Sequence, residues 1–275
     1  MIGGIDAGSA RVFAALLEAR TGQRIAAGRS WRFDTALGPL LQAHGLERVD
    51  QLTARLLEGK DKQLADRIVD ALLNQETSFF RDVGVIEAAA VAMADRPAPR
   101  IWCAACATGQ EPLSLAMLFA EAGGAMPAII ATDVSAAAIT RARDASYTQF
   151  EIQRGLPVRR MVQWFEPAAD NQWRAATALT GAIQYRRHNL VVDVAPTGEF
   201  DLILCRNVLF YFAPQLREKV LERLAGALRP DGLLLLGAGE TVIGQSERLR
   251  PSARARGFYE RVPVSDERNR VYTGG

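Results

Sequence analysis

The chain contains 275 residues, of which 49% are apolar and 23% are charged. At about 150 residues per domain this length indicates one large or two modest domains, and the composition excludes a disordered or disulfide-stapled chain. The net charge of +2 is too balanced to indicate nucleic-acid binding. No apolar run approaches the roughly 18 residues of a membrane-spanning helix, and the N-terminus lacks a signal-peptide pattern. We therefore expect a cytoplasmic protein without membrane insertion.

Residues 1–84 show helical periodicity and no strand pattern, which predicts a helical N-terminal domain. Apolar residues recur at helical spacing in four stretches, around residues 12–17, 37–41, 52–57 and 64–73. Gly22 follows the first stretch and is expected to end that helix.

After a proline-rich break at residues 95–99, short apolar runs alternate with helical patterns. These runs predict strands at residues 101–105, 129–133, 183–186, 201–205 and 233–236. They are continuously apolar, which is typical of parallel strands covered on both faces. Residues 85–275 are therefore expected to form an α/β domain with a doubly wound, Rossmann-like sheet. Residues 150–182 interrupt the alternation, and we interpret them as a small antiparallel β insertion.

The turn after the first predicted strand carries a chemical signal. It reads Ala105-Cys-Ala-Thr-Gly-Gln-Glu111, and small residues between a strand and a helix let the backbone approach a nucleotide closely. It lacks both Gly-x-Gly-x-x-Gly and Gly-x-x-x-x-Gly-Lys, which disfavours dinucleotides and triphosphates. An adenosine ligand without a pyrophosphate, such as S-adenosylmethionine, fits better. Cys103 and Cys106 lie nearby, but no second ligand pair accompanies them, so we expect no metal site.

Polar side chains near the ends of the predicted strands are candidates for ligand contacts. Asp133 ends the second strand, where a carboxylate accepts hydrogen bonds from ribose hydroxyls; the alternative is a helix N-cap, which Ser135 could equally provide. Glu111 lies in the first turn of a helix, where it either contacts a cationic ligand group or interacts with the helix dipole. Asn207 is a candidate ligand contact after the fourth strand. Tyr211 is a candidate wall of the acceptor pocket, with core packing as the alternative.

Four segments together resemble the CheR-type chemotaxis receptor methyltransferases, which are protein-glutamate O-methyltransferases. The segments are residues 76–82, 101–116, 201–212 and 228–241. The resemblance implies that S-adenosylmethionine donates a methyl group to receptor glutamates in sensory adaptation, with S-adenosylhomocysteine as product. It also implies that the partner is the cytoplasmic helical domain of methyl-accepting chemotaxis receptors. We expect a monomer that binds no nucleic acid and no metal.

The resemblance assigns roles to individual residues. Arg81 and Tyr211 are the implied catalytic residues, with Arg81 orienting a carboxylate and Tyr211 lying near the transferred methyl group. Gln75 stands where the family usually has asparagine, so we expect a weakened or shifted contact there. The implied cofactor-binding residues are Gln75, Thr77, Arg81, Glu111, Asp133, Asn189, Leu190, Asn207 and Val208.

Two other functions stay open at this stage. The chain could be a non-catalytic S-adenosylmethionine-binding scaffold in a signalling array, although Arg81 and Tyr211 speak mildly against this. It could also be a methyltransferase for another substrate, such as an amine or a nucleic acid. Enzymes that methylate amines commonly carry Asn-Pro-Pro followed by Tyr or Phe after the fourth strand, whereas residues 207–210 read Asn-Val-Leu-Phe.

Overall fold

The computed structural model describes residues 5–25 and 31–263, which fold as two compact units. The helical unit runs to Asn74 and includes Tyr211–Ala213, while the sheet unit holds Gln75–Phe210 and the chain from Pro214 onward. Residues 75–84, which the sequence grouped with the N-terminal helices, fold with the sheet unit. Within the described residues, no helix is both long enough and apolar enough to cross a bilayer.

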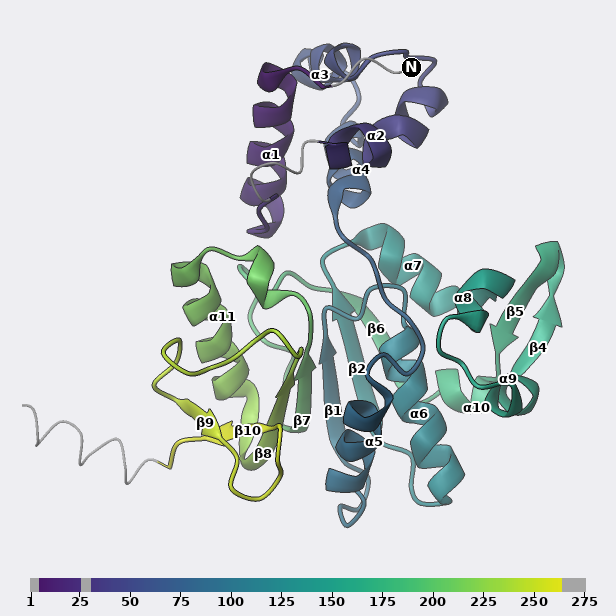
Figure 1. Ribbon diagram of the computed structural model, residues 1–275, viewed down its shortest axis with the longest axis vertical. Helices are drawn as coiled ribbons and strands as arrows, with labels where there is room; N and C mark the ends of the chain where they lie inside the picture. Colours follow the sequence, from purple (N-terminus) through teal and green to yellow (C-terminus); the bar gives the residue numbers. More distant parts are fainter. Residues whose placement is uncertain (1–4, 26–30, 264–275) are drawn as a thin grey trace, which may run out of the picture. The chain divides into compact units, whose positions relative to one another are not determined.

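The helical unit confirms the four predicted helices (Figure 1). They are α1 (Ala7–Thr21), α2 (Trp31–Ala43), α3 (Val49–Glu58) and α4 (Leu64–Leu72). α1 begins because the Asp6 carboxylate accepts hydrogen bonds from the first turn, and it ends at Gly22, whose φ of 74° is left-handed. The apolar faces meet in a core that includes the fully buried Phe13, Leu37 and Ile68.

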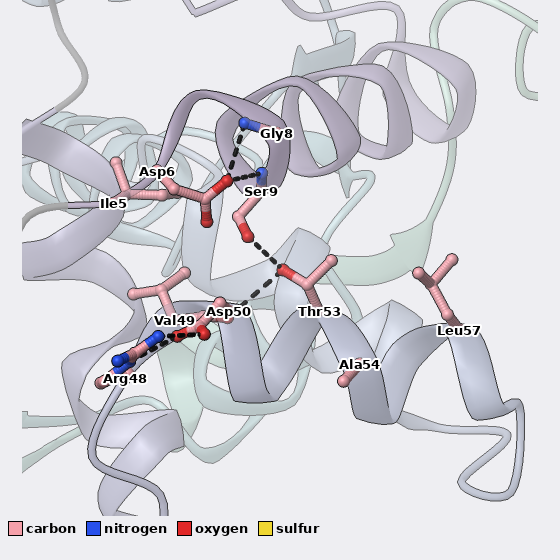
Figure 2. Close-up of a pocket in the computed structure, with 10 residues that line it drawn as sticks. All are labelled: Ile5, Asp6, Gly8, Ser9, Arg48, Val49, Asp50, Thr53, Ala54 and Leu57. Carbon is pink, nitrogen blue, oxygen red and sulfur yellow. Dashed lines mark hydrogen bonds and ion pairs between the residues drawn. The ribbon is translucent and has the colours of Figure 1, made fainter.

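A cavity of about 780 Å³ lies in this helical unit, lined by residues of α1 and α3 and the residues before them (Figure 2). Its polar lining atoms already bond to one another. Thr53 donates to the Ser9 hydroxyl at 2.8 Å, and the Arg48 guanidinium binds the Asp50 carboxylate. Because these groups are already paired within the wall, we assign the cavity no chemistry.

The sheet unit contains a seven-stranded sheet in the order β6-β2-β1-β7-β8-β10-β9 (Figure 1). The strands are β1 (Arg100–Ala104), β2 (Ala128–Asp133), β6 (Ile183–Arg187), β7 (Phe200–Cys205), β8 (Leu228–Leu236), β9 (Leu249–Pro251) and β10 (Tyr259–Arg261). The first five strands in the sheet order are parallel, and β10 pairs antiparallel with β8 and β9. The strand order reverses between β1 and β7, which confirms the predicted doubly wound, Rossmann-like fold and marks its switch point.

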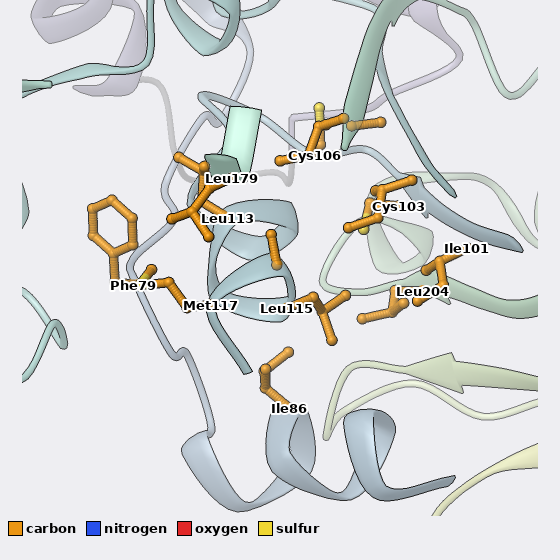
Figure 3. Close-up of a cluster of buried hydrophobic side chains, with 14 of the residues drawn as sticks. Phe79, Ile86, Ile101, Cys103, Cys106, Leu113, Leu115, Met117, Leu179 and Leu204 are labelled. Carbon is orange, nitrogen blue, oxygen red and sulfur yellow. The ribbon is translucent and has the colours of Figure 1, made fainter. Parts of the chain in front are cut away.

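Helices complete this unit and enclose its core. They are α5 (Val83–Ala92), α6 (Gln110–Ala122), α7 (Ala136–Asp144), α10 (Thr177–Thr180) and α11 (Pro214–Ala227). Figure 3 shows Ile86 of α5 and Leu115 of α6 directed towards Ile101 of β1 and Leu204 of β7. All six residues of β7 are buried, so the continuously apolar run is explained by packing on both faces.

The insertion forms a three-stranded antiparallel sheet in the order β3-β5-β4. Its elements are β3 (Ser146–Thr148), α8 (Gln149–Gln153), α9 (Val158–Trp164), β4 (Phe165–Ala168), η1 (Ala169–Asn171) and β5 (Gln172–Ala175). The Phe79 ring packs edge-on against Tyr147 and Phe165, with centroids 5.0 and 5.5 Å away. Gly155 has a φ of 93°, and a Cβ there would lie 2.1 Å from the Phe79 carbonyl oxygen. The insertion is therefore fixed to the segment that precedes α5.

Candidate functional site

Hydrogen bonds tie together the loops at the carboxyl ends of the parallel strands. His188 N, after β6, donates to the carbonyl of Asp133 at the end of β2, at 2.9 Å. Ala107 N, after β1, donates to Asp133 Oδ2 at 2.9 Å. Asn207 N, after β7, donates to the carboxylate of Glu240, after β8, at 2.8 Å. These bonds gather five loops at the edge of the sheet where ligands bind in open α/β folds.

The turn between β1 and α6 has a strained backbone. Ala105, Ala107 and Gly109 have φ values of 67°, 47° and 94°, all in the left-handed region. A left-handed alanine costs about 1–2 kcal/mol. A Cβ on Gly109 would lie only 2.9 Å from the Tyr185 hydroxyl, so a glycine is required there for space as well as conformation. Strain of this kind concentrates at ligand-binding turns.

Asp133 is oriented by its neighbours on both sides. Its Oδ1 accepts from Ser135 N and its Oδ2 from Ala107 N, each at 2.9 Å. Ser135 is the N-cap of α7, because its hydroxyl accepts from Ala138 N at 3.0 Å. The capping role therefore belongs to Ser135, and the Asp133 carboxylate is held in one orientation at the edge. Gln75 reaches the same place, since its Nε2 donates to Ser135 Oγ at 2.9 Å.

Glu111 forms an ion pair that the sequence analysis did not anticipate. Arg206 Nη1 donates to Glu111 Oε2 at 3.0 Å, and the side chains are 2% and 13% exposed. Burial raises the pKa of the Glu111 carboxyl, and the charge of Arg206 opposes that rise. The sequence feature that could have indicated this pair is Arg206 itself, a charged residue that directly follows the fully buried strand β7.

The segment before α5 carries Arg81 and Thr77. Arg81 Nη1 donates to the Glu76 carbonyl at 3.2 Å, and Arg81 Nη2 lies 3.4 Å from Glu76 Oε2. Arg154 Nη2 donates to the other carboxylate oxygen of Glu76 at 2.7 Å. The Arg81 side chain is 32% exposed, and Thr77 is half-buried in the same segment. Arg81 thus already holds one carboxylate.

Glu240 is a second residue that sequence reasoning missed. Its carboxylate accepts backbone hydrogen bonds from Asn207, Val208, Leu209 and Gly237, at 2.7 to 2.8 Å. These bonds fix the loop after β7, where Asn207 has a left-handed φ of 59°. The signal was present in the segment at residues 228–241, in which Glu240 was not given a role.

Asn189 and Leu190 lie in a turn after β6. Asn189 Oδ1 accepts from Val191 N at 2.9 Å, and Asn189 N donates to Asp193 Oδ2 at 2.8 Å. The Leu190 carbonyl accepts from Arg223 Nη1 of α11 at 2.9 Å. The turn is therefore stabilised by hydrogen bonds between its own side chains and backbone, and by Arg223 of α11.

A histidine and three cysteines near the site have structural surroundings. His188 packs edge-on against Trp102 with centroids 5.6 Å apart. Cys103, Cys106 and Cys205 are buried free thiols, and burial raises the pKa of each, so they stay neutral. Among the residues that the structure describes, no group of His, Cys, Asp or Glu side chains could hold a metal ion.

Tyr211 is placed in the helical unit, whereas the other predicted site residues belong to the sheet unit. It ends η2 (Leu209–Tyr211), and its hydroxyl bonds to Asn74 Nδ2. Its carbonyl accepts from Arg24 N at 2.8 Å. None of the predicted site residues lines the cavity shown in Figure 2.

Comparison with known proteins identifies the family to which the chain belongs. The family described as "CheR methyltransferase, SAM binding domain" matches residues 75–258, more than half of the chain. A chemotaxis protein methyltransferase from Vibrio parahaemolyticus is 33% identical over 250 residues, covering 86% of this chain and 90% of that protein. A chemotaxis protein methyltransferase from Pseudomonas putida is 31% identical over 258 residues, covering 88% and 92%.

Among solved structures, a TehB-like SAM-dependent methyltransferase from Corynebacterium glutamicum aligns with a TM-score of 0.41 and 18% identity, covering 64% of this chain and 88% of that one. The family match and the two curated relatives, rather than this structural likeness, decide the assignment. The chain therefore belongs to the CheR methyltransferases and is an S-adenosylmethionine-dependent methyltransferase.

Proposed function

We propose that the chain transfers the methyl group of S-adenosylmethionine to glutamate side chains in the helical domain of chemotaxis receptors, forming glutamate methyl esters. The names of the curated relatives support a chemotaxis protein as acceptor. The observation that carries the proposal is a pair of fixed carboxylates, Asp133 and Glu111, at the carboxyl edge of the sheet. The Arg81 backbone is held at the same edge by a hydrogen bond from Arg206.

The side chains at this edge fit S-adenosylmethionine. This cofactor supplies a methyl group on a positively charged sulfur, and it carries a ribose and a cationic amino group. Asp133, held by two backbone N–H groups, suits the ribose hydroxyls. Glu111, nearly buried, suits the amino group. The remaining lining is assigned to Gln75, Thr77, Asn189, Leu190, Asn207 and Val208.

A carboxylate acceptor suits the side chains that this site offers. A glutamate has a reference pKa of about 4.3, so it is ionised at neutral pH and requires no general base. Arg81 contacts the Glu76 carboxylate in the structure, which supports a role in orienting an incoming carboxylate. The His188 ring packs against Trp102, and its Nε2 contacts the Val194 carbonyl.

The test is methyl transfer from radiolabelled S-adenosylmethionine to membranes that contain chemotaxis receptors. We expect label in receptor bands that alkali releases as methanol, with mass spectrometry placing the modification on glutamates. Label that resists alkali would show a different acceptor, and no label at all would favour the non-catalytic scaffold.

Arg81→Ala tests the proposed role of Arg81 in the same assay, with S-adenosylmethionine also at saturation. Turnover at saturating receptor should fall by about 100-fold or more, because losing one charged hydrogen-bond partner from a reaction centre has effects of this size. Arg159→Ala, which removes an exposed arginine of α9, is the matched control. Unchanged turnover of Arg81→Ala would remove Arg81 from the mechanism.

A further inference from the structure

Arg206 is a buried cation at the candidate site that the proposed function leaves without a role. Its side chain is 2% exposed. It directly follows β7, which pairs with β1 on one side and β8 on the other, so its backbone position is fixed from both sides. A guanidinium in such a place loses its hydration, and only carboxylates in good geometry compensate that loss.

The Arg206 guanidinium joins two separate segments of the site. Nη1 donates to Glu111 Oε2 of α6 at 3.0 Å. Nη2 donates to Asp82 Oδ2 at 2.5 Å and to the Arg81 carbonyl at 3.2 Å. Nε has no partner in the described part of the chain. One planar group therefore links the first turn of α6 to the segment that carries Arg81.

The two carboxylates depend on Arg206 to different degrees. The Asp82 side chain is 44% exposed, so water can solvate it without Arg206. The Glu111 side chain is 13% exposed, and burial raises its pKa, while Arg206 and then Arg81 lower it and Glu240 raises it. The thiols of Cys103, Cys106 and Cys205 also interact with Glu111, and their raised pKa values keep them neutral.

We propose that Arg206 is a positioning residue, which keeps Glu111 as a fixed, ionised carboxylate for the cationic amino group of the methyl donor and anchors the Arg81 backbone. This inference rests on the proposed function, because it needs the donor at this edge. Without Arg206, the pKa of the Glu111 carboxyl rises further, which favours its neutral form, and a neutral carboxyl no longer attracts a cation. A lysine keeps the charge, but its single ammonium cannot reach both segments as a planar fork does.

Calorimetric binding of two ligands tests the proposal independently of turnover. S-Adenosylhomocysteine carries the amino group, and 5′-methylthioadenosine lacks it. For Arg206→Gln at pH 6 we expect S-adenosylhomocysteine to bind about tenfold or more weakly relative to the unsubstituted protein, and 5′-methylthioadenosine within about twofold. The deficit should be smaller at pH 8 than at pH 6, because a higher pH favours the ionised form of the Glu111 carboxyl. Each variant is compared with the unsubstituted protein at the same pH, so titration of the ligand itself cancels.

Two further variants provide controls. Glu111→Gln should weaken the binding of S-adenosylhomocysteine relative to that of 5′-methylthioadenosine at both pH values. The double variant with Glu111→Gln and Arg206→Gln should show no further weakening. Arg96→Gln breaks a partly buried arginine–carboxylate contact to Asp201, at the opposite end of β7. It should leave the ratio of the two affinities unchanged even where it lowers stability.

The possible outcomes separate the two proposals. If Arg206→Gln binds S-adenosylhomocysteine normally at both pH values, or loses both ligands equally, the positioning role is wrong. If that variant does not fold, Arg206→Lys decides: S-adenosylhomocysteine should bind about threefold more weakly with 5′-methylthioadenosine unchanged, and an unaltered ratio overturns the role. If the unsubstituted protein binds no S-adenosylhomocysteine, the proposed function itself fails.

Discussion

The helical unit and the carboxyl edge of the sheet differ in how far their paired charged side chains are exposed. In the helical unit, Arg20 and Asp66 form a pair with side chains 56% and 49% exposed. At the sheet edge, Arg206 and Glu111 are 2% and 13% exposed. Exposed pairs contribute at most about 1 kcal/mol, whereas buried pairs cost desolvation and are weak sources of stability. The contrast fits our proposal that the charges of the sheet edge serve ligand binding rather than folding.

The two units also differ in backbone strain. In the described part of the helical unit, left-handed φ values belong to glycines, namely Gly22, Gly45 and Gly59. The sheet unit holds nine left-handed residues that are not glycine: Phe80, Asp82, Ala98, Ala105, Ala107, Ala145, Asp170, Asn171 and Asn207. Five of the nine lie in segments 80–82, 105–107 and 207, which surround the candidate site. Strain is therefore concentrated where the site needs particular loop shapes.

Removing the Asp133 carboxylate should have the largest effect, and it tests whether carboxylates of the sheet edge differ in function from exposed ones. The two charged hydrogen bonds that we propose between Asp133 and the ribose would be lost, so S-adenosylhomocysteine should bind about 100-fold more weakly to Asp133→Ala. Calorimetry measures this, with Asp144→Ala, an exposed carboxylate at the end of α7, as the matched control. Equal affinities for the two variants would mean that the sheet edge uses its carboxylates no differently from the surface.

A pair of glycine substitutions sharpens the comparison of backbones. Gly155→Ala should destabilise the sheet unit by about 3 kcal/mol or more, because the new Cβ meets the Phe79 carbonyl in addition to the unfavourable φ. In the helical unit, Gly59 has a φ of +66°, and a Cβ added there would meet no atom within 4 Å. Gly59→Ala should therefore lower the free energy of unfolding by only about 1 kcal/mol. Urea unfolding followed by circular dichroism measures both, and similar costs would contradict the steric account.

Glu260 of β10 tests how a buried carboxylate couples to pH. Burial raises its pKa, but hydrogen bonds from Ser252, Arg254 and Arg250 outweigh this and leave the pKa below its usual value. Its stabilising contribution is therefore present above the unfolded pKa and is lost as the pH falls through the folded pKa. Glu260→Gln should cost about 1–2 kcal/mol at pH 7 and less in acid. A cost that is independent of pH between 7 and 3 would contradict this assignment.

The smallest expected effect concerns the strained turn after β1. Ala107→Gly relieves a φ of 47° and should leave the protein unchanged or about 0.5 kcal/mol more stable, since glycine adopts this conformation freely. Ala54→Gly, in the exposed interior of α3, should instead cost about 1 kcal/mol. Thermal unfolding compares the two, and a loss of stability in Ala107→Gly would show that the turn is not strained.

Much of the fold could be read from the sequence because its signals are local. The apolar run at residues 201–205 predicted a buried parallel strand, and it is β7. Gly22 predicted the end of α1 because its left-handed conformation requires no distant partner. Local periodicity also assigned residues 75–84 to the helical domain, since nothing in that segment reveals that Phe79 packs against the insertion.

The pairing within the site could not be predicted in the same way. Arg206 and Glu111 are 95 residues apart, and only the sheet topology brings them together. Glu240 binds backbone N–H groups of the loop after β7, and backbone groups carry no sequence signature. Asp133 could be named as a candidate because the end of a parallel strand is a recognisable position, but its hydrogen bond to Ala107 depends on the folded turn.

Ligand selection by the full chain tests the central claim most directly. Calorimetry with S-adenosylhomocysteine, NAD⁺ and ATP compares a ligand without a pyrophosphate with two that contain linked phosphates. The account predicts saturable binding of S-adenosylhomocysteine at one site and no binding of NAD⁺ or ATP. Binding of either phosphorylated nucleotide in place of S-adenosylhomocysteine would contradict it.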